Sequence, residues 1–199
     1  MDWEKVFQTY ETLINQTVQT GNLSIVAPDV VGDQASTLDL WAEHAQRMKR
    51  WIDAGSRVIV PLQVGRLSAG DLLEEAFKLF GTRKLCAGVP SNLAAMTAND
   101  AATIRHGDFH ILGRVVLTPE LAEKLSAILQ SNPDAQLTAD ANWLRARTAR
   151  ISSLASALPR SNMPFDCRRS RAIKELLVVD GYHLQAHRFS SAPLTRPAS

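Results

Sequence analysis

The chain has 199 residues, of which 45% are hydrophobic, and its net charge is +2. This length fits one domain, or one domain with a tail, and supplies enough apolar residues for a sizeable core. Two cysteines are too few for a disulfide scaffold or a cysteine-rich zinc site. No window approaches the roughly 18 apolar residues of a membrane span, and the N-terminus lacks the apolar core of a signal peptide, so we expect a cytoplasmic protein that does not contact membranes.

Charge is spread unevenly along the chain. Residues 1–140 hold 12 Lys and Arg against 17 Asp and Glu, whereas residues 141–199 hold 10 against 3. A basic segment on an acidic body favours a polyanionic partner, nucleic acid first, although a solvated Arg-rich helix fits equally well. The pattern of elements weakens after about residue 155. We therefore predict a β/α domain over 1–155 and a basic C-terminal segment over 156–199 with a disordered end.

Helices and strands alternate along the predicted domain. Apolar residues at helical spacing predict a helix over 3–19, and a continuous Val/Ile run predicts a buried strand over 23–31. The next helix is expected to begin at Ser36, with Asp39 as part of its cap. Further strands are predicted over 57–64, 84–89, 108–116 and 135–139, and further helices from Ser68 to Gly81, over 99–105 and from Thr118 to Asn132.

The predicted strands begin about 25–33 residues apart, which is the period of β/α units. This spacing predicts an α/β fold with a mainly parallel sheet. Both a doubly wound sheet and a partial or rearranged (β/α) barrel of the TIM type fit five such units. A complete barrel usually needs about 250 residues, so a barrel formed by this chain would be incomplete.

Polar residues and glycines gather at the predicted carboxyl ends of the strands, where β/α proteins place their sites. They are Asp29, Gln63, Gly88, the segment 110–113 and Asp140. A carboxylate and an amide can together read the edge of a polar heterocycle, and a glycine lets a planar ligand approach the backbone. A second acid at another strand end can act as nucleophile or general base.

Each of these residues also has a purely structural interpretation. Asp29 could cap the following turn, Gln63 could hydrogen-bond a loop, and Asp140 could cap a helix that begins near Ala141. His110, inside a strand, could be a satisfied core histidine. The sequence contains no phosphate-binding loop and no GxGxxG, GxSxG or HExxH pattern.

Five short motifs occur in a characteristic order. They are Ala27-Pro28-Asp29, Pro61-Leu62-Gln63, Ala87-Gly88-Val89-Pro90-Ser91, His110-Ile111-Leu112-Gly113 and Thr138-Ala139-Asp140. In this order they resemble the later strands of tRNA-guanine transglycosylases. They are more similar still to relatives that insert 7-deazaguanine derivatives into DNA. The resemblance covers roughly residues 20–150.

The resemblance implies a (β/α)₈ barrel that exchanges a guanine-type base in DNA or tRNA, a pentosyltransferase reaction that proceeds through a covalent bond between an aspartate and the ribose C1′. It implies that Asp140 is the nucleophile. The residues that would bind the base are Asp29, Gln63, Gly88, Leu112 and Gly113, with Leu112 under the base and Gly88 in contact through its backbone. In this interpretation the phosphates are held by Arg147, Arg150, Arg168, Arg169 and Arg171.

The sequence departs from the family pattern in two respects. It has no counterpart of the early strand that carries a second catalytic aspartate, and Cys167, His183 and His187 do not make the family's zinc site of three cysteines and a histidine, so we predict no metal and no cofactor. The second hypothesis is a non-catalytic partner subunit or degenerate relative, with a second copy or another subunit supplying the missing strands. A β/α lyase or aldolase is a third, weaker interpretation, because no lysine stands out as a Schiff-base residue.

Overall fold

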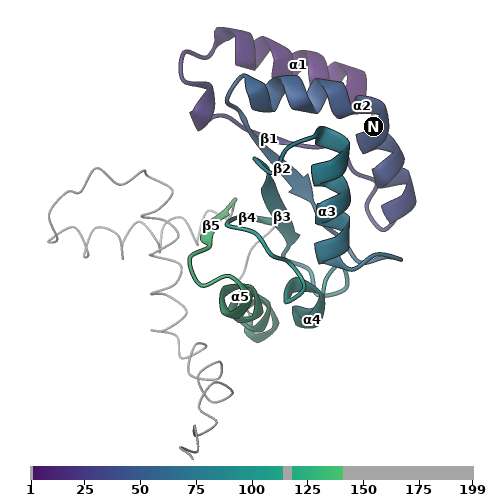
Figure 1. The fold of residues 1–199 in the computed structure, drawn as a ribbon, viewed down its shortest axis with the longest axis vertical. Helices are drawn as coiled ribbons and strands as arrows, with labels where there is room; N and C mark the ends of the chain where they lie inside the picture. Colours follow the sequence, from purple (N-terminus) through teal and green to yellow (C-terminus); the bar gives the residue numbers. More distant parts are fainter. Residues whose placement is uncertain (1, 114–117, 141–199) are drawn as a thin grey trace, which may run out of the picture.

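The computed structural model describes residues 2–113 and 118–140, and the description below concerns these residues (Figure 1). Five parallel strands lie in the sheet order β1-β2-β3-β4-β5. The strands are β1 (Ser24–Val26), β2 (Arg57–Pro61), β3 (Cys86–Pro90), β4 (Asp108–Leu112) and β5 (Gln136–Ala139). The helices are α1 (Trp3–Gln16), η1 (Thr20–Asn22), α2 (Gln34–Asp53), α3 (Ala69–Phe80), α4 (Ala98–Ala101) and α5 (Pro119–Ser131).

The strand order distinguishes the two architectures that the sequence allows. A doubly wound sheet reverses its order at a switch point. Among the described strands the order never reverses, because each strand pairs in parallel with the next one along the chain. The predicted α/β class with β/α repeats is confirmed, and the described part has the strand order of a partial (β/α) barrel.

Alternation along the strands gives the sheet two different faces. The helix-packed face is apolar and continues into a single core with the helices, to which the strands contribute Ile25, Val58, Val60, Ala87, Val89, Phe109, Ile111 and Leu137. The opposite face carries Arg57, Asp108, His110 and Thr138, which bond to one another. This second face corresponds to the interior of a barrel. It is polar around these four residues and apolar where Ile59 and Leu112 meet over β3.

Helix α1 adds a layer outside α2, as Figure 1 shows. Phe7 is fully buried and packs edge-on against Trp51 of α2, with ring centroids 5.5 Å apart. Arg47 of α2 pairs with Glu4 at 2.7 Å and with Glu11 at 3.0 Å, which fixes the alignment of the two helices.

Two predicted boundaries are wrong at the first β/α unit. Strand β1 ends at Val26, well before the expected residue 31, and Pro28, which has no amide hydrogen for the ladder, follows it. Helix α2 begins at Gln34, two residues before Ser36, because Asp33 is the cap and accepts from the Ser36 amide at 3.0 Å. Asp39 is exposed and takes no part in the cap.

The other boundaries agree better with the sequence. Ser68 caps α3, and Gly81 ends it in a left-handed conformation with φ +65°. Thr118 caps α5 with Pro119 in the first turn. Helix α4 is shorter than expected, and its capping box is formed by Thr97 and Asp100.

Part of the sequence-based description lies outside the described residues. This applies to the basic segment 156–199 and to the helix expected after Asp140, so the domain boundary near residue 155 stays a prediction. Within the described residues, no helix has both the length and the apolar character needed to cross a membrane.

The loop after β1 is tied to α2 by one buried tryptophan, and this contact is testable. Trp41 is fully buried and donates from Nε1 to the carbonyl of Pro28 at 2.8 Å. We expect Trp41→Phe to lower the free energy of unfolding by about 2 kcal/mol, because it leaves that carbonyl unpaired and a gap in the core. Urea denaturation measures the change.

Trp51 provides a matched control on the same helix. Its buried Nε1 has no hydrogen-bond partner among the described residues. Trp51→Phe therefore removes ring volume without breaking a hydrogen bond, and it should cost clearly less than Trp41→Phe. Equal losses in the two variants would show that the bond to Pro28 contributes nothing.

Candidate functional site

The ends of β2, β3 and β4 and the loops that follow β1 to β4 line an open cavity of about 560 Å³, here called the carboxyl-end cavity. Its size lies within the range of roughly 300–1,000 Å³ that is usual for small-molecule sites. It is lined by Asp29, Val31, Pro61, Leu62, Gln63, Pro90, Ser91, Asn92, Ala95, Leu112, Gly113 and Thr118. Four of the predicted base-binding residues, Asp29, Gln63, Leu112 and Gly113, thus lie together, as expected for residues at the ends of parallel strands.

Asp29 is the acid of this cavity. It lies in the loop after β1 and is half-buried, and none of the described residues donates a hydrogen bond to its carboxylate or pairs with it. Burial raises the pKa of Asp29 because desolvation penalises the charged form. The structural alternative, in which Asp29 caps the following turn, does not apply, because no described backbone amide donates to its carboxylate; helix α2 is capped by Asp33. The Asp29 carboxylate therefore keeps its full capacity to accept hydrogen bonds.

Gln63 is occupied by the loop that carries Asp29. Its Oε1 accepts from the Gly32 amide at 2.7 Å, and its Nε2 donates to the Val30 carbonyl at 3.1 Å and to Thr37 Oγ1 at 2.9 Å. Both amide hydrogens are used, so Gln63 has no donor left for a base. In this arrangement Gln63 does not offer its amide group to the edge of a heterocycle, contrary to the prediction. It anchors the loop after β1 instead.

A second glutamine, which the sequence analysis missed, completes this anchor. Gln34 is buried at the start of α2 and donates from Nε2 to the carbonyls of Gln63 and Leu67, both at 3.1 Å. Its Oε1 accepts from the Leu67 amide at 2.8 Å. No periodic pattern marks a residue of this kind, because its partners come from a loop about thirty residues away along the chain.

Gly88 is covered by side chains. A Cβ at this position would lie 2.8 Å from Leu112 Cδ1 and 2.9 Å from Ile59 Cγ2. The glycine therefore allows Leu112 of β4 and Ile59 of β2 to close over β3, and the expected open approach of a planar ligand to its backbone is not present. Leu112 itself lines the cavity, as does Gly113, whose φ is +91°.

Lys124 supports the loop on the other side of the cavity. Its side chain lies on the inner face of α5 at 0% exposure, and Nζ donates to the carbonyls of Pro90 at 2.7 Å and Asn92 at 3.1 Å. Burial lowers the pKa of Lys124 to about 8. Lys124 was not predicted as a site residue, although a lysine among Leu121, Leu125 and Ile128 in the apolar stripe of a helix is a visible signal of a buried amine.

Asp140 follows β5 and is bound by a histidine. His110 Nε2 lies 3.0 Å from Asp140 Oδ1, and His110 Nδ1 lies 2.7 Å from Thr138 Oγ1. Burial lowers the pKa of His110, and the neighbouring Asp140 carboxylate partly opposes this effect. The histidine is buried, as its structural interpretation required, yet its partner is the predicted nucleophile. Asp140 is not part of the lining of the carboxyl-end cavity.

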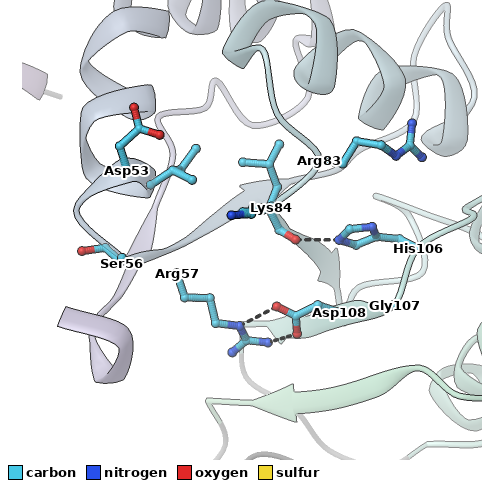
Figure 2. Close-up of a pocket in the computed structure, with 11 residues that line it drawn as sticks. Asp53, Ser56, Arg57, Arg83, Lys84, His106, Gly107 and Asp108 are labelled. Carbon is cyan, nitrogen blue, oxygen red and sulfur yellow. Dashed lines mark hydrogen bonds and ion pairs between the residues drawn. The ribbon is translucent and has the colours of Figure 1, made fainter. Parts of the chain in front are cut away.

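A second cavity of about 630 Å³ lies at the opposite, amino ends of β2 to β4 (Figure 2). Figure 2 shows Arg57 joined to Asp108 by two bonds. His106 Nε2 lies 2.6 Å from the carbonyl oxygen of Leu85. Arg83, also labelled in Figure 2, pairs at 2.9 Å with Glu74, which does not line the cavity. Most charges here are neutralised by partners within the chain, so we place the candidate site at the carboxyl ends.

The remaining site assignments concern metals and phosphates. Within residues 2–113 and 118–140, no group of three or more His, Cys, Asp or Glu side chains is placed to hold a metal ion. The predicted phosphate contacts lie outside the described residues and stay predictions; they are Arg147, Arg150, Arg168, Arg169 and Arg171.

Comparisons with known proteins add little to this geometry. No family model matches the chain, and no curated protein matches it. Among the solved structures that match is a monomeric variant of dihydrodipicolinate synthase, with a TM-score of 0.38 and 13% identity over 91% of this chain and 71% of that chain. A likeness of this degree carries no conclusion about activity, and the fold class rests on the described sheet.

Lys124 gives the site a pH-dependent stability. Its pKa falls from 10.5 unfolded to about 8 folded, so between these values the unfolded chain binds more protons and stability rises with pH. We expect the stability of the wild type relative to Lys124→Met to increase by up to about 3 kcal/mol from pH 8 to pH 10.5. Urea denaturation at several pH values measures this difference. A constant difference would contradict a depressed lysine pKa.

Proposed function

We propose that the carboxyl-end cavity binds a guanine- or 7-deazaguanine-type base and that the chain acts in base exchange on nucleic acid. The observation that carries this proposal is the Asp29 carboxylate, which lies half-buried at a cavity of suitable size without a partner among the described residues. The resemblance of the strand-end motifs to transglycosylases points to the same class of base.

The chemistry of Asp29 favours guanine over adenine. The Watson–Crick edge of guanine offers two adjacent donors, the N1–H and the exocyclic amino group, and a carboxylate accepts from both. Adenine presents an acceptor at N1, which would face the carboxylate lone pairs. The partly desolvated surroundings of Asp29 strengthen such hydrogen bonds.

Other lining residues complete the proposed pocket. Pro61 and Leu112 supply apolar surface for the face of the base. Because Gln63 has no donor left, the hydrogen bonds to the carbonyl oxygen O6 of guanine come from Ser91 and Asn92 in the β3–α4 loop. The proposal therefore assigns to this loop the donor role that the sequence gave to Gln63.

In the catalytic form of the proposal, Asp140 is the nucleophile. A carboxylate oxygen of Asp140 bonds to the ribose C1′ while the bond from C1′ to the base N9 breaks and its electron pair leaves with the guanine. The incoming base then attacks C1′ through its own N9 and releases the aspartate. The departing guanine gains one proton and the incoming base loses one, so the overall exchange consumes and releases no protons.

A second candidate function is a non-catalytic partner subunit or degenerate relative in a nucleic-acid modification complex. Among the described strands, β1 and β5 each pair on one side only. Open sheet edges of this kind are normally paired or covered. A second copy of the chain or another subunit that adds strands would cover them and complete a barrel.

Sedimentation equilibrium of the full chain separates these arrangements. If copies complete the barrel for one another, the measured mass will be a multiple of 21.9 kDa at micromolar concentration. A mass of 21.9 kDa across the concentration range would exclude a barrel completed by a second copy.

Base binding is tested by titration calorimetry with guanine, a 7-deazaguanine derivative and adenine. We expect selective binding of the first two, with an affinity that falls by about 10–100-fold in Asp29→Asn, since a charged hydrogen bond contributes roughly 1.5–3 kcal/mol. The same variant should be slightly more stable than the wild type, because it removes a partly desolvated charge. Asp39→Asn, an exposed change on α2, should alter neither property.

The pH dependence of binding follows from the same carboxylate. The pKa of Asp29 is raised, so protonation removes the acceptor as pH falls through a value above that of an ordinary aspartate. Affinity for guanine should decline in that range in the wild type and stay flat in Asp29→Asn. Full affinity in Asp29→Asn would contradict the proposed role of the carboxylate.

A further inference from the structure

Asp140 stands at the end of a chain of polar side chains that crosses the helix-free face of the sheet. We propose that His110 is a positioning residue for Asp140, whose carboxylate it orients for attack on C1′ by a hydrogen bond from Nε2. This inference rests on the proposed base exchange and assigns the residue that prepares its nucleophile.

The register of two neighbouring strands creates the contact. His110 of β4 is paired with Thr138 of β5, and Asp140 lies two residues further along the chain, on the same face. The imidazole lies between them, 2.7 Å from Thr138 Oγ1 and 3.0 Å from Asp140 Oδ1. With 7% exposure, His110 has a fixed orientation and contacts Asp140 from the protein interior.

Counting protons shows which nitrogen faces the acid. A carboxylate only accepts, so His110 Nε2 must carry a hydrogen for the 3.0 Å contact to be favourable. If Nδ1 accepts from the Thr138 hydroxyl, the imidazole is neutral. If Thr138 instead donates to the Phe109 carbonyl at 3.2 Å, Nδ1 must also carry a hydrogen and the ring is charged. In both arrangements Nε2 donates to Asp140.

The surroundings favour the neutral form. Burial is the largest effect on the pKa of His110 and lowers it, and Arg57 acts in the same direction, whereas Asp140 and Asp108 oppose both. Arg57 Nη1 also donates to Thr138 Oγ1 at 3.0 Å, and the hydroxyl can then direct its own hydrogen to Nδ1. Arg57 is held in turn by Asp108, as Figure 2 shows.

A neutral imidazole suits the proposed reaction better than a charged one. It orients the carboxylate by one hydrogen bond without cancelling the negative charge that attacks C1′. The hydrogen bonds from Arg57 through Thr138 to His110 fix the ring and its tautomer, as a buried acid does for a catalytic histidine in other enzymes.

The pair is tested first without reference to activity. Nitrogen-15 NMR of the full chain with labelled histidine gives the tautomer and pKa of His110, assigned by its loss in His110→Gln. We expect a neutral ring with its hydrogen on Nε2, and in Asp140→Asn a pKa lower by about one unit, a tenfold loss of proton affinity. Asp134→Asn, at an exposed residue before β5, should leave the pKa unchanged. A His110 titration unaffected by Asp140→Asn would overturn the pairing.

The second arm measures the rate of the covalent adduct with guanine-containing duplex DNA and with tRNA. His110→Leu removes the hydrogen-bond donor and should slow adduct formation by about 100-fold. A rate loss of this size is typical when a reacting group is misplaced by about 1 Å. His110→Gln keeps an amide hydrogen near the position of Nε2 and should restore most of the rate. Neither variant should change the affinity for free guanine, which Asp29 controls.

The outcomes separate this inference from the proposed function. An unchanged rate in His110→Leu overturns the positioning role even where NMR shows the pair. No adduct with the wild-type chain on either nucleic acid overturns base exchange, while the NMR result still decides whether His110 donates to Asp140. Should His110→Leu unfold, Thr138→Val removes the support of the ring, and the same loss of rate is expected.

Discussion

The candidate site depends on how the loop after β1 satisfies its polar backbone. Pro28 bonds to Trp41, and Gln63 bonds to Val30 and Gly32, so the loop is tied to α2 and to the end of β2 by side chains. A buried or half-buried backbone group without a partner is costly, and these bonds remove that cost. They also hold the loop in one conformation, in which Asp29 faces the cavity with its carboxylate unpaired among the described residues.

The middle strand of the sheet shapes the helix-free face by having small side chains. Gly88 leaves space that Ile59 and Leu112 fill from the neighbouring strands. Arg57 likewise reaches from β2 past β3 to Asp108 on β4. Strands that are not adjacent in the sheet are thereby joined above β3, and an apolar layer near the carboxyl ends lies beside a charged one near the amino ends.

The two ends of the sheet differ in how their charges are compensated. At the amino ends, Arg57 and Arg83 have carboxylate partners. At the carboxyl ends, Asp29 is partly desolvated without a described partner, and Asp140 meets a buried imidazole whose pKa is lowered. Asp29, whose pKa is raised, lines the carboxyl-end cavity, and a perturbed titratable group at a cavity is typical of a functional site. This difference between the two ends is the physical basis for placing the site where we do.

The sequence by itself determined the repeating β/α pattern, the caps of α3 and α5, and the gathering of Asp29, Gln63, Leu112 and Gly113 at one end of the sheet. These features follow from local periodicity, from capping residues and from the parallel strand direction. Only the tertiary structure decided what each side chain does there. In the folded chain Gln63 hydrogen-bonds the loop after β1, Lys124 is buried under the loop after β3, and His110 pairs with Asp140. Hydrogen bonds between residues about thirty positions apart depend on register and on side-chain direction, and neither is encoded in a local pattern.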